Sequence, residues 1–257
     1  MIKKSPNITN KLWSCSAVFL TLLLWQFATG VGIVDAFLLP SPLQVGKAFA
    51  TEFPSLMEHS AITLSEAFIG LAIGILFGFI MAMAMDRFDF LYRAFYPLAI
   101  LTQTVPTVAV APLLVLWFGY GMTPKVVLIV ITTFFPITIG LLTGFKSADP
   151  DAINLLRAMG ASQGQIFRYI KLPGAMGHFF SGLRISSSYA VVGAVISEWL
   201  GGFGGLGVYM TRVKKAFSFD KMFAVIFLIS AISLLFMHGV EKLQLLCMPW
   251  YRRTENK

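Results

Sequence analysis

The sequence predicts an all-α, polytopic membrane protein with six transmembrane helices. Of its 257 residues, 57% are hydrophobic and only 12% are charged, and the mean hydropathy is +0.77. A soluble domain of this length could not bury so much apolar surface. Six apolar stretches alternate with polar or glycine-rich segments, and each is long enough for the ~20 residues that cross a bilayer.

The first apolar stretch, residues 12–34, is uncharged and follows a short polar leader that is rich in lysine. A cleaved signal peptide shares this order of a basic start and an apolar run. The length of the run and the lack of a small-x-small cleavage site favour a retained first span. The two cysteines, Cys15 and Cys247, lie near opposite ends of the chain and support neither a disulfide framework nor a metal site.

Residues 35–60 predict an external loop with a short amphipathic helix that lies against the membrane. The apolar positions of this helix are Val45, Phe49 and Phe53. The second span follows at residues 61–85. Three glycines recur in it at every fourth position, so that one face is smooth and a neighbouring helix can approach closely: Gly70, Gly74 and Gly78.

The third span, residues 96–118, contains three prolines and several polar side chains. A proline in a helix that faces lipid leaves carbonyl groups unpaired, so such segments lie inside a bundle or beside water. This stretch is therefore either a kinked structural helix or a helix that lines a pathway. Its candidate pathway residues are Gln103, Thr104, Pro106 and Pro112. Residues 125–145 form the fourth span.

The polar interval from Asp149 to Pro173 predicts two short helices joined at a glycine. Asp149 is a candidate N-cap with a proline at the first helical position. Gly160 can adopt the left-handed conformation that ends the first helix. Ser162 and Gln165 form a capping box for the second helix, which we expect to end at Pro173.

Residues 178–200 and 221–246 form the fifth and sixth spans, and a glycine-rich and then basic loop, residues 201–220, connects them. Glu198 lies near the end of the fifth span, where a carboxylate is costly unless it meets water, a partner or a ligand. It is either hydrated at the outer interface or part of an outer gate, beside a tight glycine turn. The other candidate residues for this pathway and gate are Ser187, Gly205 and Gly207.

The basic residues predict the orientation. With the N-terminus inside, the inner segments hold fourteen of the 20 lysines and arginines and the outer segments hold six. This asymmetry places both termini and the central loop in the cytoplasm. It also accounts for the net charge of +8 without nucleic acid. Four of the six outer residues cluster in the last loop: Arg212, Lys214, Lys215 and Lys221.

Several motifs together resemble a known family. The central interval resembles the Glu-Ala-Ala loop of ATP-binding-cassette (ABC) importer permeases. Residues 105–119 and 198–207 are similar to the subgroup that imports nitrate, sulfonates, taurine and thiamine-type pyrimidines. The resemblance covers about residues 40–245, and residues 157–161 keep the motif better than the three positions before them, where the glutamate and both alanines are replaced. The resemblance assigns ATPase coupling to Asn154, Leu155, Leu156, Arg157, Ala158, Met159, Gly160, Ala161, Ile166, Leu172 and Pro173.

This resemblance implies a permease subunit in a bacterial inner membrane, with a cytoplasmic coupling-helix loop between spans four and five. The permease core is residues 61–246, preceded by residues 1–60 and followed by a basic cytoplasmic tail, residues 247–257. The implied partners are a second permease copy in a homodimer, a cytoplasmic ABC ATPase dimer, an external substrate-binding protein and membrane lipid, with no nucleic acid and no cofactor. The chain lacks G-x-x-x-x-G-K-[ST], so ATP hydrolysis belongs to a partner and the chain is not an enzyme.

Alternatives remain for two surfaces. Without the motif, the central helices read as an amphipathic pair on the inner leaflet rather than as coupling helices. The outer basic cluster, residues 212–221, either snorkels at the headgroups or meets acidic patches on the external binding protein.

The substrate is also open. Residues 198–212 and 219–222 look closer to permeases for thiamine-precursor pyrimidines than to those for nitrate, and aliphatic sulfonates or taurine are the alternative. A secondary carrier would need buried ionisable residues along its pathway, and the predicted spans are nearly bare of them. An intramembrane hydrolase would need a nucleophile and a base, but no G-x-S-x-G elbow accompanies Ser186 to Ser188.

Overall fold

The computed structural model describes residues 8–35 and 37–249. Lys3, Lys4, Arg252, Arg253 and Lys257, which count toward the predicted orientation, lie outside these residues. All regular secondary structure in the described part is helical: α1 (Ile8–Gly30), α2 (Pro42–Thr51), α3 (Phe53–Arg87), α4 (Asp89–Thr104), α5 (Thr107–Phe118), α6 (Met122–Lys146), α7 (Pro150–Ala158), α8 (Gln163–Ile166), the π-helical turn η1 (Phe167–Lys171), α9 (Leu172–Leu200), α10 (Leu206–Lys215) and α11 (Phe219–Cys247).

Four helical runs are long and apolar enough to cross a membrane. They are α3, α6, α11 and the run Gln163–Leu200, which joins α8, η1 and α9. The pair α4 and α5 meets the same test as one broken span, and Ser16–Gly30 in α1 is a shorter apolar helix. The chain is thus an all-helical, polytopic membrane protein with four or five candidate spans among the described residues.

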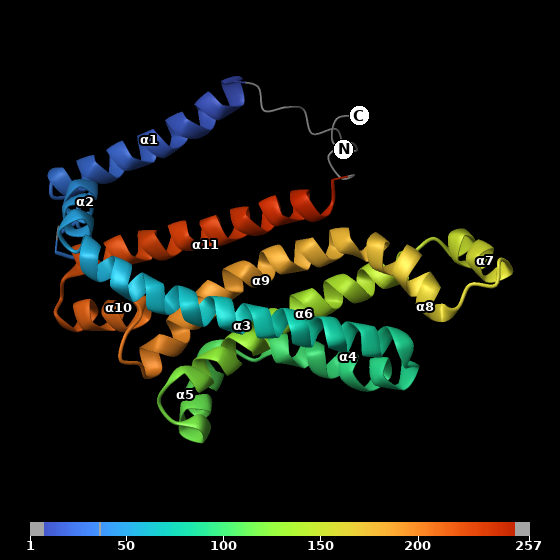
Figure 1. Cartoon of the computed structure of the whole chain (residues 1–257). Helices are drawn as coiled ribbons and strands as arrows, with labels where there is room; N and C mark the ends of the chain where they lie inside the picture. Colours follow the sequence, from blue (N-terminus) through green and yellow to red (C-terminus); the bar gives the residue numbers. More distant parts are fainter. Residues whose placement is uncertain (1–7, 36, 250–257) are drawn as a thin grey trace.

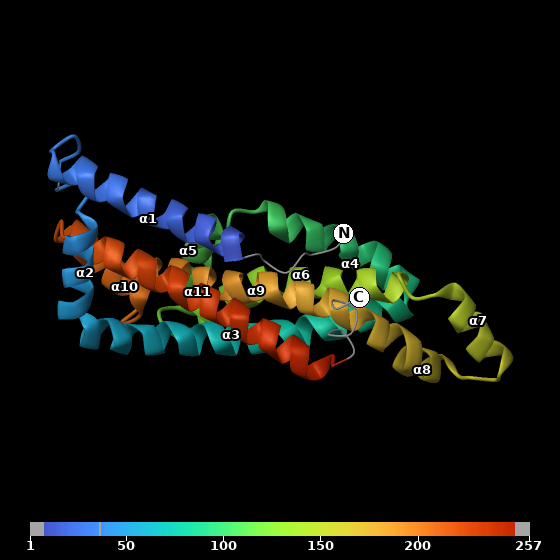
Figure 2. The same ribbon diagram turned by 90° about the horizontal axis from the view of Figure 1, so that it is seen from above.

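The long helices lie lengthwise beside one another and the short ones lie at the two ends (Figures 1 and 2). α2 and α10 lie at one end, which we call the outer end, and α7 and α8 project at the opposite end, the inner end. The main apolar core joins buried side chains of α3, α6 and α9, among them Leu71, Ile137 and Val191. Large apolar side chains such as Phe68 and Leu235 face outward, as suits helices surrounded by lipid.

The three glycines of α3 allow α6 to pack closely, as their spacing predicts. A Cβ atom at Gly70 would lie 2.6 Å from Cβ of Ile129, and one at Gly78 would lie 3.1 Å from Cγ2 of Ile137. Gly74 lies similarly close to Thr133. The smooth face of α3 is therefore a helix-packing surface.

The segment before the second span differs from the prediction. α2 forms with Ser41 as its N-cap, and the hydroxyl of Ser41 accepts the Gln44 N–H at 3.3 Å. Its buried residues, Val45 and Ala48, pack against Ala224 of α11. The helix α3 begins at Phe53, before the predicted second span, and contains the whole of residues 61–85. The burial of α2 against the protein depends on tertiary packing that local apolar spacing does not encode.

The third span is broken, not merely kinked. α4 and α5 are bent by 103° at the break between them. Pro106 has no N–H, and Val105 before it adopts an extended conformation with φ −81° and ψ 123°, as residues before proline prefer. Within the predicted third span, residues 96–118, the chain therefore forms parts of two helices rather than one kinked helix.

Two helical features of the second half also depart from the prediction. The second central helix does not end at Pro173, because the run continues from Gln163 to Leu200. At η1 the Leu172 N–H bonds the carbonyl of Phe167, five residues back, so that Pro173 falls in the first turn of a new α-helical segment, where its missing N–H is tolerated. The predicted loop 201–220 contains a helix, α10.

Candidate coupling and translocation sites

The loop at the inner end has the local structure that its sequence predicts. The Asp149 carboxylate accepts the Asp151 N–H at 2.9 Å, and Pro150 occupies the first turn of α7. Gly160 ends this helix region with φ +83°. Ser162 and Gln165 exchange the two hydrogen bonds of a capping box, 3.3 and 2.7 Å long. These caps satisfy N–H groups at the start of both short helices with side chains from the loop itself.

The predicted coupling residues divide into exposed and anchoring groups. α7 has no buried residue, and Leu155 and Met159 are 63% and 74% exposed. Ile166 is 1% exposed, and the ring of Phe167 packs against Phe145 of α6 with 5.2 Å between centroids. The loop therefore has a base fixed to the bundle and an apolar tip that no described residue covers. Asn154, Arg157, Ala158, Gly160 and Pro173 are exposed, and Leu156, Ala161 and Leu172 are half-buried.

An ion pair fixes the base of this loop to α3. Nζ of Lys171 lies 2.8 Å from both carboxylate oxygens of Asp86. A hollow of about 290 Å³ lies beside the pair, between the end of α3 and the α8–η1 segment. The loop is thus joined to three of the long helices: α3, α6 and α9.

A groove runs beside the break between α4 and α5. It consists of two hollows, of about 300 and 410 Å³, that share Gln103 of α4 and Tyr189 of α9. The first is also lined by Thr102, Val105, Pro106, Thr107, Thr132, Val192, Gly193 and Ile196. The second is also lined by Phe135, Pro136, Ile139, Gly140, Thr143, His178, Ser181, Gly182 and Ile185. We refer to the two hollows together as the broken-helix groove.

The predicted pathway residues are only partly brought together. Gln103 and Pro106 line the broken-helix groove, whereas Pro112 lines a separate hollow with Tyr120 and Leu200. Thr104 lines neither part of the groove, and its hydroxyl donates to the Leu101 carbonyl at 2.8 Å. Ser187 is buried and donates to the Arg184 carbonyl at 2.7 Å. The sequence reading missed Tyr189, although a tyrosine directly after a row of serines in a span was a visible signal.

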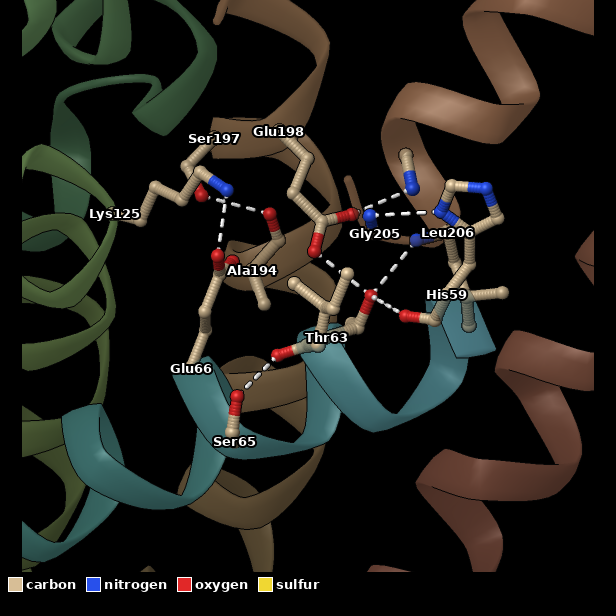
Figure 3. A network of polar contacts seen from close by, with 12 residues as sticks. His59, Thr63, Ser65, Glu66, Lys125, Ala194, Ser197, Glu198, Gly205 and Leu206 are labelled. Atoms are coloured by element: carbon tan, nitrogen blue, oxygen red, sulfur yellow. Dashed lines mark hydrogen bonds and ion pairs between the residues drawn. The ribbon is translucent and has the colours of Figure 1, made fainter. Parts of the chain in front are cut away.

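A buried ion pair lies toward the outer end of the bundle. Nζ of Lys125, near the start of α6, lies 2.5 Å from Oε1 of Glu66 in α3, and each side chain is only 5% exposed (Figure 3). Oε2 of Glu66 is buried and has no hydrogen-bond partner among the described residues. A pair of this kind is costly to build and very costly to break, because either partner alone would be an uncompensated buried charge.

Three side chains accept hydrogen bonds from the backbone at the start of α10. The N–H groups of Gly205, Leu206 and Gly207 donate to His59 Nδ1, Thr63 Oγ1 and Glu198 Oε2 at 3.0, 2.8 and 2.6 Å. The Thr63 hydroxyl donates in turn to Glu198 Oε1 at 2.8 Å (Figure 3). The free N–H groups at the start of a helix need such partners, and a carboxylate there is stabilised by the helix dipole. We call this arrangement the α10 clamp.

The α10 clamp and the buried ion pair each correct an expectation from the sequence. Glu198 is 1% exposed, so the interpretation of a hydrated carboxylate at the outer interface is wrong. The statement that the spans are nearly bare of ionisable residues is also wrong, since Glu66, Lys125 and Glu198 are all buried. The sequence reading missed Glu66 and Lys125 and assigned no chemistry to His59. Glu66 stands alone in the apolar stretch 61–85, and that isolated charge was the signal that could have found it.

The outer basic residues make different contacts. Nζ of Lys221 lies 2.5 Å from Oε1 of Glu52, and the Tyr209 hydroxyl donates to Oε2 of Glu52 at 3.0 Å. The hydrogen bond from Lys221 is the main reason why the pKa of Glu52 lies below its usual value. Burial, and next the neighbouring Glu52, raise the pKa of the Tyr209 hydroxyl. Lys214 and Lys215 are exposed on α10.

An exposed helical loop at one end, a broken span beside a groove and several long apolar helices are features that suit a subunit of a membrane transporter. The sequence pattern of the family described as "Binding-protein-dependent transport system inner membrane component" matches residues 74–244. The chain belongs to this family, the permeases of ABC importers. It is a multi-pass inner-membrane permease and not itself an ATPase, and permeases of this family pair with an ATPase and a binding protein.

Individual relatives carry different substrates in their names. The chain is 36% identical over 233 residues to the formylaminopyrimidine transport permease protein ThiX of Halalkalibacterium halodurans, covering 90% of this chain and 93% of that protein. It is 29% identical over 249 residues to the taurine transport system permease protein TauC of Escherichia coli, covering 94% and 90%. A crystal structure of an amino acid ABC transporter with histidines shares the fold, with a TM-score of 0.62, 19% identity and coverage of 80% of this chain and 96% of that one.

Proposed function

We propose that this permease imports a thiamine-precursor pyrimidine that an external binding protein delivers. The observation that carries this proposal is the higher identity to the formylaminopyrimidine permease than to the taurine permease, each over most of the chain. The motifs of residues 198–212 and 219–222 favour the same substrate class. An aliphatic sulfonate such as taurine is the second candidate, because a permease of that name is also similar over nearly the whole chain.

The proposed topology has six spans, with α1 as the first and the pair α4 and α5 as the third. α1 has 23 residues, a length of roughly 35 Å that can cross a bilayer. α1 runs away from the inner end and α11 runs toward it (Figures 1 and 2), which supports cytoplasmic termini on the side of α7 and α8. The permease core of residues 61–246 contains the whole segment that matches the family pattern.

The proposed coupling element is the α7–α8 loop. Its exposed apolar tip, with Leu155 and Met159, suits a groove on a cytoplasmic ATPase, and its base is anchored by Ile166. Closure of an ATPase dimer on ATP would displace the loop and rotate the attached long helices as rigid bodies. ATP binding then favours the outward-facing state, and hydrolysis with release restores the inward-facing state.

The proposed outer gate includes Glu198, Gly205 and Gly207, because the α10 clamp joins them at the outer end. The exposed Lys214 and Lys215 suit acidic patches on the binding protein. The second permease is proposed to be another copy of this chain, which would close the open side of the broken-helix groove.

The test is ATP-dependent uptake into proteoliposomes that contain the permease, its candidate ATPase and its binding protein. Labelled hydroxymethylpyrimidine and taurine are offered in parallel, to wild type and to Gly160→Pro. Proline cannot adopt the φ of +83° at this position, so we expect the loop to be displaced. Gly239→Ala is the control, because a Cβ atom there meets nothing within 4 Å.

The expected result is uptake of the pyrimidine that is abolished by Gly160→Pro in a folded protein and retained by Gly239→Ala. Uptake of taurine alone would replace the proposed substrate with the second candidate. Full uptake by Gly160→Pro would overturn the coupling role of the loop.

A further inference from the structure

The two hollows of the broken-helix groove meet at a pair of side chains that face each other from different helices. Gln103 lies at the end of α4, just before the break, and Tyr189 lies in the middle of α9. Both are exposed, and neither side chain makes a hydrogen bond to another described residue. Each therefore presents a donor and an acceptor to whatever occupies the groove.

The rest of the lining combines apolar side chains with a few hydroxyl groups, and none of these lining residues is an acid, a lysine or an arginine. Thr102, Thr107 and Thr132 contribute hydroxyls, and Thr102 and Thr132 already donate to carbonyls of their own helices, so that they offer acceptor lone pairs. His178 is the one titratable side chain that is not a tyrosine among the described lining residues of both hollows. The charges of the outer half, Glu66 and Lys125, pair with each other elsewhere.

The size and the aromatic lining of the groove suit a small ring-shaped solute. Its volumes of about 300 and 410 Å³ lie at the lower end of the range of small-molecule sites. Aromatic rings of Phe135 and Tyr189 line the second hollow. Gly193 lines the first hollow without a side chain.

We infer that the broken-helix groove is a binding site for the solute in transit, and that Gln103 and Tyr189 select a neutral, planar, hydrogen-bonding solute over a charged one. This inference rests on the proposed pyrimidine substrate and names the residues that recognise it inside the permease. An ion would have to leave water without a counter-charge in the lining, and burying an unpaired charge is far more costly than burying a hydrogen-bonded neutral group. An uncharged heteroaromatic ring can exchange its hydrogen bonds with water for those of an amide and a phenol.

The test measures occupancy directly, in the permease–ATPase complex without the binding protein. Val192 lines the first hollow and is 44% exposed. Val192→Cys, in a background with Cys15→Ser and Cys247→Ser, is labelled with a maleimide in the presence of hydroxymethylpyrimidine or of its monophosphate. Phe203→Cys, in the exposed turn after α9, is the control position.

At ten times its half-saturating concentration the neutral pyrimidine should slow labelling of Val192→Cys about tenfold, by simple occupancy. It should leave Phe203→Cys unchanged. Adding Gln103→Leu should raise the half-saturating concentration about tenfold, and Tyr189→Phe several-fold, because each leaves a solute polar group without its partner. Tyr96→Phe, a tyrosine of α4 outside the groove lining, should have no effect.

Equal protection by the monophosphate would overturn the selection for neutral solutes, and absence of protection by either probe would overturn the site. Retained protection in both Gln103→Leu and Tyr189→Phe would overturn the role of these two residues. Pyrimidine uptake by wild-type proteoliposomes answers the separate question of the proposed function, so the two failures are distinguishable.

Discussion

The short helices at the two ends of this permease are stabilised in opposite ways. At the outer end, three side chains accept hydrogen bonds from N–H groups at the start of α10. This helix also buries five of its residues: Leu206, Gly207, Val208, Tyr209 and Val213. At the inner end, α7 buries none and relies on caps from its own sequence. The hydrogen-bonding groups and apolar side chains of α10 are therefore satisfied within the protein, whereas α7 presents apolar side chains that no described residue covers.

This difference separates two kinds of function for short helices in a membrane protein. A helix fixed by long-range contacts, such as those of His59 and Thr63, transmits the position of the spans it touches. A helix fixed by local caps keeps its shape while its surroundings change. The second kind suits a surface that must stay docked on a moving partner, as we propose for α7.

The largest expected effect comes from breaking the buried ion pair between Lys125 and Glu66 near the outer end, where long-range contacts hold the structure together. Lys125→Met leaves the Glu66 carboxylate buried without its counter-charge, and we expect a loss of about 3–5 kcal/mol in the free energy of unfolding. SDS-induced unfolding in mixed micelles measures this quantity. Arg93→Met is the control, because it breaks the exposed pair with Asp89 and should have little effect. Equal losses of unfolding free energy in the two variants would contradict the view that long-range buried contacts stabilise the outer end.

A second test compares two glycines that both have positive φ. Gly205, with φ +115°, has no room for a Cβ atom beside the Glu198 carboxylate, whereas Gly160, with φ +83°, has open space around it. Gly160→Ala should cost only the backbone term of about 1–2 kcal/mol. Gly205→Ala adds displacement of Glu198 and should cost at least about 1 kcal/mol more. The same unfolding assay measures both costs. A smaller cost for Gly205→Ala than for Gly160→Ala would show that the α10 clamp rearranges at little energetic cost.

At the inner end we expect a large effect on transport with little effect on stability. Leu155→Ala and Met159→Ala remove exposed apolar side chains, so the free energy of unfolding should change by no more than about 0.5 kcal/mol. Uptake should fall about tenfold if either side chain is an interface hot spot. Leu43→Ala, equally exposed on α2 at the other end, should leave uptake unchanged. A loss of stability that matched the loss of uptake would mean that α7 depends on the bundle.

The smallest effect concerns pH at the outer end. Because the folded pKa of Glu52 lies below its usual value of 4.5, the ionised carboxylate stabilises the fold above that pH, and the contribution is lost as the pH falls through the folded pKa. The pair with Lys221 is partly exposed, so we expect only a few tenths of a kcal/mol. Glu52→Gln should lower the melting temperature slightly at pH 7, and the difference from wild type should shrink as the pH falls below 4.5 and through the folded pKa of Glu52. A constant difference across this range would exclude the ion pair as its cause.

Local chemistry made the inner loop predictable from the sequence. The caps at Asp149 and Ser162, and the stop at Gly160, act over three or four residues, so a reading of neighbours along the chain suffices. The spacing of Gly70 and its two companions likewise identified a packing face before its partner was known. The family motif lies in the same interval, and it could be recognised from the sequence without knowledge of the fold.

Long-range contacts account for what the sequence did not reveal. Lys125 is 59 residues from Glu66 along the chain, and Glu198 is 135 residues from Thr63, so the buried pair and the clamp have no local signature. The break at Pro106 was visible as a proline, but its angle depends on packing against α6 and α9. Pro173 misled the reading because a π-helical turn can absorb a proline that would end a regular α-helix.

One unbroken run of helix joins the two ends. From Gln163 to Leu200 it contains 38 residues, roughly 57 Å at the rise of an α-helix. One end of this rod carries the capping box of the inner loop and the other carries the carboxylate of Glu198. In the coupling proposed here, a torque applied at the first end would reach the second through backbone hydrogen bonds rather than through a relay of side chains. The π-helical turn Phe167–Lys171 is the one irregular stretch along this run.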